Sequence, residues 1–316
     1  MKKFLALIIL SLILGSSVAS SNESIKKDGF LIPTNKWKDK IKIDENFKVN
    51  NPEDKIIIID NHGSDGNDVK LKDCFWIREL RNWAQLAGDK INGKEVMVYI
   101  HCQGQLEGDL GAKLGKIGMW MKKWEGPYPG TSKMDRRVEG NLEVIKKFVN
   151  IGVPKKQIFM SGHSCGGWAT LRLTAKYMEK VGGGISLMPA CFWTISKKFK
   201  VKKVGYEEAM KKFHKKYPGM AEWRQAQIDM IKEGKAPVLI FTHPMDPFEG
   251  LTSDWMDDVP NFKRVVISEK KTIDGKKCKY AGSDWEEPVK NAHTIDWADC
   301  FMHYHPLIKE YIASRL

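Results

Sequence analysis

The clearest chemical pattern in the chain is Gly162-His163-Ser164-Cys165-Gly166, which fits G-x-S-x-G. This pattern places a serine on a sharp turn between a strand and a helix, with its hydroxyl exposed for reaction. Its glycines lack Cβ atoms, so strand and helix can approach closely there. A phosphate-binding loop is excluded because the required Lys-Ser/Thr pair is missing. The pattern predicts that Ser164 is a nucleophile, and the alternative is an ordinary glycine-rich turn.

The elements around the motif alternate between short apolar runs and segments of helical period. Residues 138–149 and 168–178 carry apolar side chains at spacings of three and four, which places one apolar stripe on a helix face. Such alternation predicts one α/β domain with a mostly parallel sheet that is covered on both faces. The predicted buried strands are 55–60, 96–100, 158–161, 185–188, 238–242 and 265–268. The motif follows the third of these strands and precedes a helix that is expected to begin near Gly167.

With this strand, motif and helix, residues 55–312 resemble the α/β-hydrolase family, and within it the dienelactone-hydrolase-like and secreted serine esterase branches. The resemblance implies the chain order of oxyanion loop, serine, acid and histidine. It also implies catalysis without a metal or an organic cofactor. The chain departs from true dienelactone hydrolases, whose nucleophile is a cysteine. Making Cys165 the nucleophile would put His163 where the first glycine belongs.

The acid implied by the resemblance should follow a strand beyond the serine. Asp246 stands at the end of the run 238–242, at the carboxyl edge of the sheet where sites of open parallel sheets form. It is therefore favoured, although an aspartate before a proline is also a common turn residue. The competing acids on the following loop are Asp254, Asp257 and Asp258.

The histidine should stand later, on a loop before the last helix. His293 fits this place, because it precedes the apolar-periodic end of the chain. His303 and His305 also compete, but they stand just before Pro306 in what resembles the first turn of the final helix. We therefore expect Ser164, His293 and Asp246 to form the triad.

Two backbone N–H groups should complete the site. One donor is expected from Cys165, the residue after the nucleophile. The other is expected from the turn at residues 62–64, with Ser64 as the expected residue, because Asn61-His62-Gly63-Ser64 follows the first strong strand. The resembled family places its His-Gly loop at this position.

The stretch 192–236 is too long for a simple crossover between strands. It contains two amphipathic helical patterns, and one of them carries lysines on its polar face. Either a cap over a pocket or a long surface crossover accounts for it. Lysine and arginine total 52 against 39 acidic residues, a net charge of +13. This balance favours contact with anionic surfaces or substrates, although an ordinary solvated lysine surface accounts for it more simply.

The first 19 residues are expected to be a signal peptide, followed by an N-terminal arm at 20–54 and the hydrolase domain at 55–316. Lys2 and Lys3 precede an apolar run at 4–14, and small residues follow it. No later apolar run is long enough to span a membrane, so we expect an exported, periplasmic or extracellular protein. Export allows disulfides. The expected pairs are Cys278–Cys300, Cys74–Cys102 and, with weaker support, Cys165–Cys191.

These expectations together predict an exported serine hydrolase that cleaves small or polymeric carboxylic esters through an acyl-enzyme. One alternative is a non-catalytic scaffold of the same fold that binds an anionic surface or glycan through its lysines. A second alternative is a serine peptidase of the same fold. Nucleic-acid binding is not expected, because the basic residues form no recognisable module.

Overall fold

The computed structural model describes residues 24–25, 27–63, 75–102, 133–192, 194–267, 272–273, 275–281, 286–289 and 291–316. Within these residues nine strands form one sheet, in the order β11-β10-β9-β8-β4-β7-β2-β3, with β6 paired to β7. Six of them run parallel: β4 (Lys55–Asn61), β7 (Lys94–His101), β8 (Ile158–His163), β9 (Gly183–Leu187), β10 (Val238–Thr242) and β11 (Phe262–Val266). These are the six strands that the sequence predicts, with ends shifted by up to three residues.

The other edge of the sheet is antiparallel and comes from the N-terminal part of the chain. β2 (Gly29–Leu31) pairs with β7, and β3 (Ile43–Asp44) pairs with β2. Part of the predicted arm at 20–54 therefore extends the main sheet. The short strand β6 (Lys90–Ile91) also pairs with β7 in the antiparallel sense.

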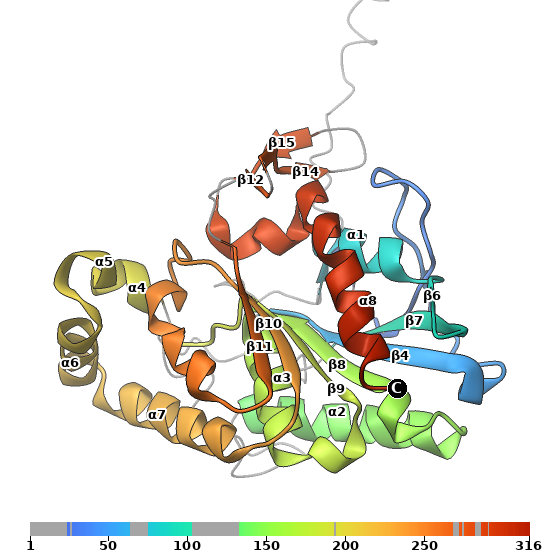
Figure 1. Cartoon of the computed structure of the whole chain (residues 1–316), viewed down its shortest axis with the longest axis horizontal. Coiled ribbons are helices and arrows are strands. Elements are labelled where there is room, and N and C mark those ends of the chain that lie inside the picture. The colour runs from blue at the N-terminus through green and yellow to red at the C-terminus, as the bar shows by residue number, and fades with distance from the viewer. Residues whose placement is uncertain are drawn as a thin grey trace, which may run out of the picture.

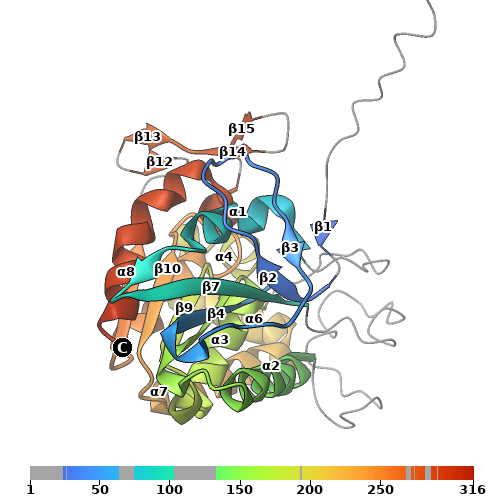
Figure 2. The ribbon, with the colours of Figure 1, turned by 90° about the vertical axis from the view of Figure 1, so that its right-hand side faces the viewer.

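Helices cover both faces of the sheet, as Figures 1 and 2 show. Side chains of α1 (Ile77–Leu86) and α8 (His305–Ala313) pack with Ile56 and Ile58 of β4 on one face. On the other face α2 (Lys133–Asn150) packs with Ile57 and Ile59, while α3 (Cys165–Lys176) and α7 (Pro218–Glu233) pack with β10. Successive strand side chains point to opposite faces, so an unbroken apolar run fills two cores. The chain has the α/β-hydrolase fold that the sequence predicts.

The predicted insertion at 192–236 is helical. It consists of α4 (Ile195–Lys198), α5 (Val201–Val204), α6 (Tyr206–Lys216) and α7. The helix α7 packs on α3 in the same apolar cluster as Phe213 of α6, while α4, α5 and α6 lie at one side of the molecule (Figure 1). The amino end of α4 is bonded to the loop after β10, since Ser196 N donates to Phe248 O at 2.7 Å. The insertion is thus anchored on the loop that carries Asp246.

Short elements complete the structure. Short 3-10 helices occur at η1 (Pro52–Asp54), η2 (Lys155–Gln157), η3 (Met178–Lys180), η4 (Gly250–Thr252), η5 (Asp254–Asp258), η6 (Ala292–Trp297) and η7 (Asp299–Tyr304). Three small antiparallel pairs join β1 (Ser24–Ile25) to β5 (Phe75–Trp76), β12 (Thr272–Ile273) to β13 (Lys276–Lys277), and β14 (Lys279–Ala281) to β15 (Glu286–Pro288). Among the helices that the structure describes, none combines the length and apolarity needed to span a membrane.

Candidate active site

Ser164 lies on a sharp turn between β8 and α3. Its backbone has φ 55° and ψ −119°, a strained conformation for a residue with a side chain. The helix begins at Cys165, two residues earlier than its pattern predicts. A Cβ on Gly166 would lie 2.0 Å from the Asn61 carbonyl oxygen, and one on Gly162 would lie 2.4 Å from the Gly166 carbonyl carbon. The glycines of the motif are therefore required by the close approach of β4, β8 and α3.

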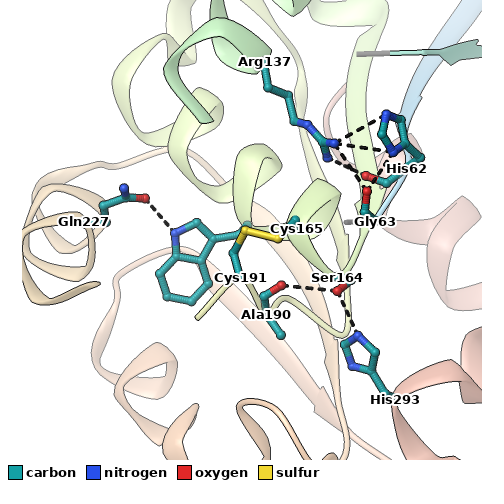
Figure 3. Close-up of a disulfide and its surroundings, with 10 residues drawn as sticks. His62, Gly63, Arg137, Ser164, Cys165, Ala190, Cys191, Gln227 and His293 are labelled. Carbon is teal, nitrogen blue, oxygen red and sulfur yellow. Dashed lines mark hydrogen bonds between the residues drawn. A yellow bond between two sulfur atoms is a disulfide. The ribbon is translucent and has the colours of Figure 1, made fainter. Parts of the chain in front are cut away.

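The structure brings Ser164, His293 and Asp246 together in one hydrogen-bonded row. His293 Nδ1 is 2.6 Å from Asp246 Oδ2, and His293 Nε2 is 2.9 Å from Ser164 Oγ (Figure 3 shows the second bond). When Nδ1 carries the proton and donates it to Asp246, Nε2 is free to accept the hydroxyl proton. All three residues are less than a tenth exposed, so bulk water screens this row weakly.

Local hydrogen bonds orient both partners of the serine. Asp246 Oδ1 accepts from the backbone N–H of Phe248 at 2.8 Å, which leaves Oδ2 for His293. On the other side, Asn291 Oδ1 accepts from the backbone N–H of His293 at 3.0 Å and begins the turn η6. The ring of Phe248 packs on that of His293, with centroids 4.3 Å apart.

The competing acids and histidines lie in other interactions. Asp254 and Asp257 bond Arg264, and Asp258 lies 3.6 Å from Lys232. His303 is exposed and packs its ring on Tyr304. His305 begins α8, where burial lowers its pKa to about 4.

The side of the site expected to bind an oxyanion is built from the turn after β4. A Cβ on Gly63 would lie 3.3 Å from Ser164 Cβ, so this turn borders the serine. Arg137 of α2 is fully buried and donates to the carbonyls of His62 and Gly63, and His62 Nδ1 lies 2.7 Å from Gly63 O (Figure 3). Ser64, the expected second donor, lies outside the described residues. Cys165, the expected first donor, is the first residue of α3, directly after Ser164.

Two disulfides join described residues, and one of them lies beside the row. Cys165–Cys191 connects the start of α3 to the segment after β9, next to Ala190, whose carbonyl lies 3.2 Å from Ser164 Oγ (Figure 3). Cys278–Cys300 brackets the segment that carries His293. Cys102 is also disulfide-bonded, and its expected partner Cys74 lies outside the described residues.

A second imidazole–carboxylate pair next to the row was not predicted from the sequence. His163 Nδ1 lies 2.8 Å from Asp296 Oδ2, and both side chains are buried. The sequence signal was weak, because His163 occupies the variable position of the motif and Asp296 stands three residues after His293. The two residues are 133 positions apart in the chain, so no local pattern indicates that they form a pair.

Two further buried carboxyls lie behind the site. Burial raises the pKa of Asp60 in β4 to about 8 and raises that of Glu79 in α1 well above its ordinary value. Asp60 is consequently held mostly protonated at neutral pH, and burial favours the protonated form of Glu79 as well. Within the described part of the chain, no cluster of three or more His, Cys, Asp or Glu side chains is arranged to hold a metal ion.

Comparisons with known proteins give weak similarities. No family model and no curated protein sequence matches the chain. Among solved structures, Est1E from Butyrivibrio proteoclasticus has 14% identity and a TM-score of 0.42, over 91% of this chain and 90% of that one. An acetyl xylan esterase from Paenibacillus sp. R4 has 13% identity and a TM-score of 0.43, over 73% and 72% of the two chains. An acylaminoacyl peptidase from Pyrococcus horikoshii has 14% identity and a TM-score of 0.44, over 69% of this chain and 33% of that one. Similarities this weak carry no argument about function, which has to come from the geometry of the site.

Proposed function

We propose that the protein hydrolyses carboxylic esters through an acyl-enzyme on Ser164, with His293 as general base and Asp246 as its partner. The observation that carries the proposal is the row Asp246–His293–Ser164, with distances of 2.6 and 2.9 Å, at a serine held with positive φ. A nucleophile, a base in hydrogen-bond reach and a group that orients the base are the minimum that this chemistry needs.

In the first half of the reaction, Ser164 Oγ attacks the ester carbonyl while His293 Nε2 takes the hydroxyl proton. Asp246 holds the Nδ1 proton and stabilises the imidazolium that forms. The negative oxygen of the tetrahedral intermediate would be bound by the backbone N–H of Cys165 and by a second N–H, which we assign to Ser64. Loss of one such donor typically lowers the rate about 10²–10³-fold.

This intermediate collapses as the imidazolium gives its proton to the leaving alkoxide, and Ser164 Oγ keeps the acyl group. In the second half, a water molecule attacks the acyl carbonyl while His293 Nε2 takes its proton. The second intermediate collapses as the imidazolium returns that proton to Ser164 Oγ, which releases the acid and the free serine. Residues 1–19 are proposed as a signal peptide, and the two disulfides between described residues fit an oxidising compartment outside the cytoplasm.

The test compares each triad residue with a competitor of the same type. We expect Ser164→Ala, His293→Gln and Asp246→Asn to lower kcat/KM for short-chain p-nitrophenyl esters by about 10⁴-fold or more. The matched controls Asp254→Asn and His303→Gln should stay within about 3-fold of the parent, because their side chains bond Arg264 or face solvent. Equal losses in the two sets would overturn the proposal.

The same assay separates an esterase from a peptidase. An ester and an amide with the same acyl group differ only in the leaving group, so their ratio of kcat/KM reports the preferred bond. A series of acyl lengths would then report the depth of the pocket. We expect esters to be cleaved and matched anilides to be cleaved far more slowly; the reverse order would assign the peptidase function instead.

A second candidate function, binding to an anionic surface, is favoured by one observation. Residues 195–216 carry nine lysines and two glutamates, and most of these lysines are exposed. Lys212 is paired with Glu208 at 3.1 Å. Within the part of the chain that the structure describes, the exposed lysines of this stretch that form no ion pair are Lys197, Lys200, Lys202, Lys203, Lys211, Lys215 and Lys216.

These lysines define a basic face on α4, α5 and α6. Because exposed charges act through attraction that salt screens, binding should weaken steeply as ionic strength rises. The test is retention on an immobilised polyuronate. Changing Lys202, Lys203, Lys215 and Lys216 to glutamate should lower the eluting salt concentration more than four such changes at Lys36, Lys48, Lys146 and Lys147. Equal shifts would assign retention to net charge alone.

A further inference from the structure

We propose that His163 and Asp296 act together as a positioning pair, which fixes the imidazole of His293 relative to Ser164 by linking the nucleophile turn to the histidine turn. The inference rests on the proposed function, because it assigns a role to residues beside the same triad. Its geometric basis is the 2.8 Å bond between His163 Nδ1 and Asp296 Oδ2.

The positions of the two residues make this bond a link between both halves of the site. His163 is the last residue of β8 and directly precedes Ser164, while Asp296 lies three residues after His293 in the short segment η6, beyond a kink at Thr294. A hydrogen bond between Ser164 and His293 alone would let the histidine turn rotate about it. The bond between His163 and Asp296 is a second link, one residue before Ser164 and three residues after His293, and it prevents that rotation.

The ring of His163 also touches the other parts of the site. Its centroid is 4.7 Å from that of His293 and 4.9 Å from that of Trp297, both tilted by nearly 60°. On another side, a Cβ at Gly63 would lie 3.4 Å from His163 Cδ2, so the ring also borders the turn after β4. One buried imidazole thus contacts the general base, the histidine turn and the expected oxyanion turn.

The charge state of the pair suits a place beside a general base. Burial lowers the pKa of the His163 imidazole, and the charge of His293 lowers it further, while Asp296 and Asp246 raise it. A neutral His163 donates its Nδ1 proton to Asp296. It therefore adds no positive charge next to His293 when that ring becomes an imidazolium.

Hydrogen bonds from α1 hold the backbone around Asp296 in place. Asn82 of α1 donates to the backbone carbonyl of Asp296, and Asn82 also bonds Ala298 O at 3.2 Å. The ionisable groups that interact with the Asp296 carboxyl from the neighbouring elements are Asp60 of β4, Glu79 of α1 and Tyr280 of β14, with Arg78 of α1 stacked on Tyr280 and Trp297. Burial raises the pKa of Asp60 to about 8 and favours the protonated form of Glu79, and in their protonated forms these carboxyls add little repulsion to a charge on Asp296.

Three variants separate the ring, the hydrogen bond and the charge. His163→Phe keeps a ring but removes the donor, whereas His163→Asn keeps a donor near the position of Nδ1. Asp296→Asn keeps the acceptor oxygen and removes the charge. We expect His163→Phe to lower kcat on an activated ester about 10–100-fold with KM within about 3-fold, because a displacement of about 1 Å can cost that much. His163→Asn should recover most of the loss.

Two readouts distinguish positioning from a loss of folding. The acid limb of the kcat/KM profile should move to lower pH in Asp296→Asn, because removing a negative charge near His293 makes its imidazolium less stable. The double variant His163→Phe/Asp296→Asn should be no slower than His163→Phe, because the two residues act as one unit. Rates are measured well below the melting temperature of each variant.

His293→Gln, assayed in parallel, distinguishes failure of the pair from failure of the function. If His293→Gln keeps its activity, the proposed function is wrong. If His293→Gln loses activity but His163→Phe keeps the parent kcat, the positioning role is overturned. An unchanged pH profile in Asp296→Asn, or equal kcat for His163→Phe and His163→Asn, would also overturn it.

Discussion

Removal of the Cys165–Cys191 disulfide should lower both the stability of the protein and its activity. The double substitution Cys165→Ala/Cys191→Ala removes a cross-link between positions 26 residues apart and keeps the backbone N–H of residue 165. For a closed loop of that length, the chain-entropy relation gives about 12 cal/mol/K, or about 3.5 kcal/mol at 25 °C. With an unfolding entropy near 0.6 kcal/mol/K for a chain of about 300 residues, the melting temperature should fall by about 5–6 °C.

The effect on activity follows from what the disulfide holds. Beside Cys191, the N–H of Ala190 donates to Ser164 O at 3.1 Å, and its carbonyl lies 3.2 Å from Ser164 Oγ. Without the cross-link, only non-covalent contacts such as these hold this segment to the nucleophile turn. We therefore expect kcat to fall about 10-fold.

Cys278→Ala/Cys300→Ala is the matched control for stability. Its residues are 22 positions apart, so the same relation gives about 3.4 kcal/mol. Urea unfolding of the parent and of both double variants, followed by fluorescence, measures the two losses. Nearly equal losses support the loop-length argument. A loss below about 1 kcal/mol for Cys165→Ala/Cys191→Ala, with unchanged kcat, would refute it.

Three further changes have defined outcomes. Gly166→Ala should prevent the nucleophile turn from forming, because its Cβ would lie 2.0 Å from Asn61 O; the yield of soluble protein and ester hydrolysis should both collapse, and normal activity would contradict this. Arg224→Met should lower the free energy of unfolding by about 3–5 kcal/mol, because it leaves the buried Glu249 carboxylate without its 2.7 Å partner, and urea unfolding measures it. Asp60→Asn should stabilise the protein at pH 7. The folded pKa of Asp60, about 8, is above its unfolded value. The free energy of unfolding of the parent therefore falls by up to about 1.4 kcal/mol per pH unit as the pH rises from about 4 to 8. The gain should vanish near pH 4, and a gain independent of pH would contradict this account.

The strands and the nucleophile turn could be predicted from the sequence because their signals are local. An apolar run such as 238–242 fits a buried strand, and the glycines around Ser164 mark a turn whose close approach forbids a Cβ. The ends were less certain: β11 covers Phe262–Val266, where apolar residues had suggested 265–268. Hydrogen bonds with neighbouring strands set such ends, and periodicity does not report them.

The supporting contacts of the site could not be predicted, because they join distant parts of the chain. Arg137 meets His62 across 75 positions, and His163 meets Asp296 across 133. No local sequence pattern indicates the distant partner of a buried arginine in a helix or of an aspartate in a polar loop. The strands β2 and β3 within the predicted arm could not be located for a related reason, since a strand of two or three residues is too short to show a period.

The most direct measurement of the central claim is covalent labelling of the purified protein by a fluorophosphonate, followed by peptide mapping. The account predicts one equivalent of phosphonate on Ser164, and no labelling of Ser164→Ala. It also predicts labelling of His293→Gln at a much lower rate, because Nε2 then no longer takes the hydroxyl proton 2.9 Å away. Absence of label on the parent protein, or equal labelling of Ser164→Ala, would contradict the account.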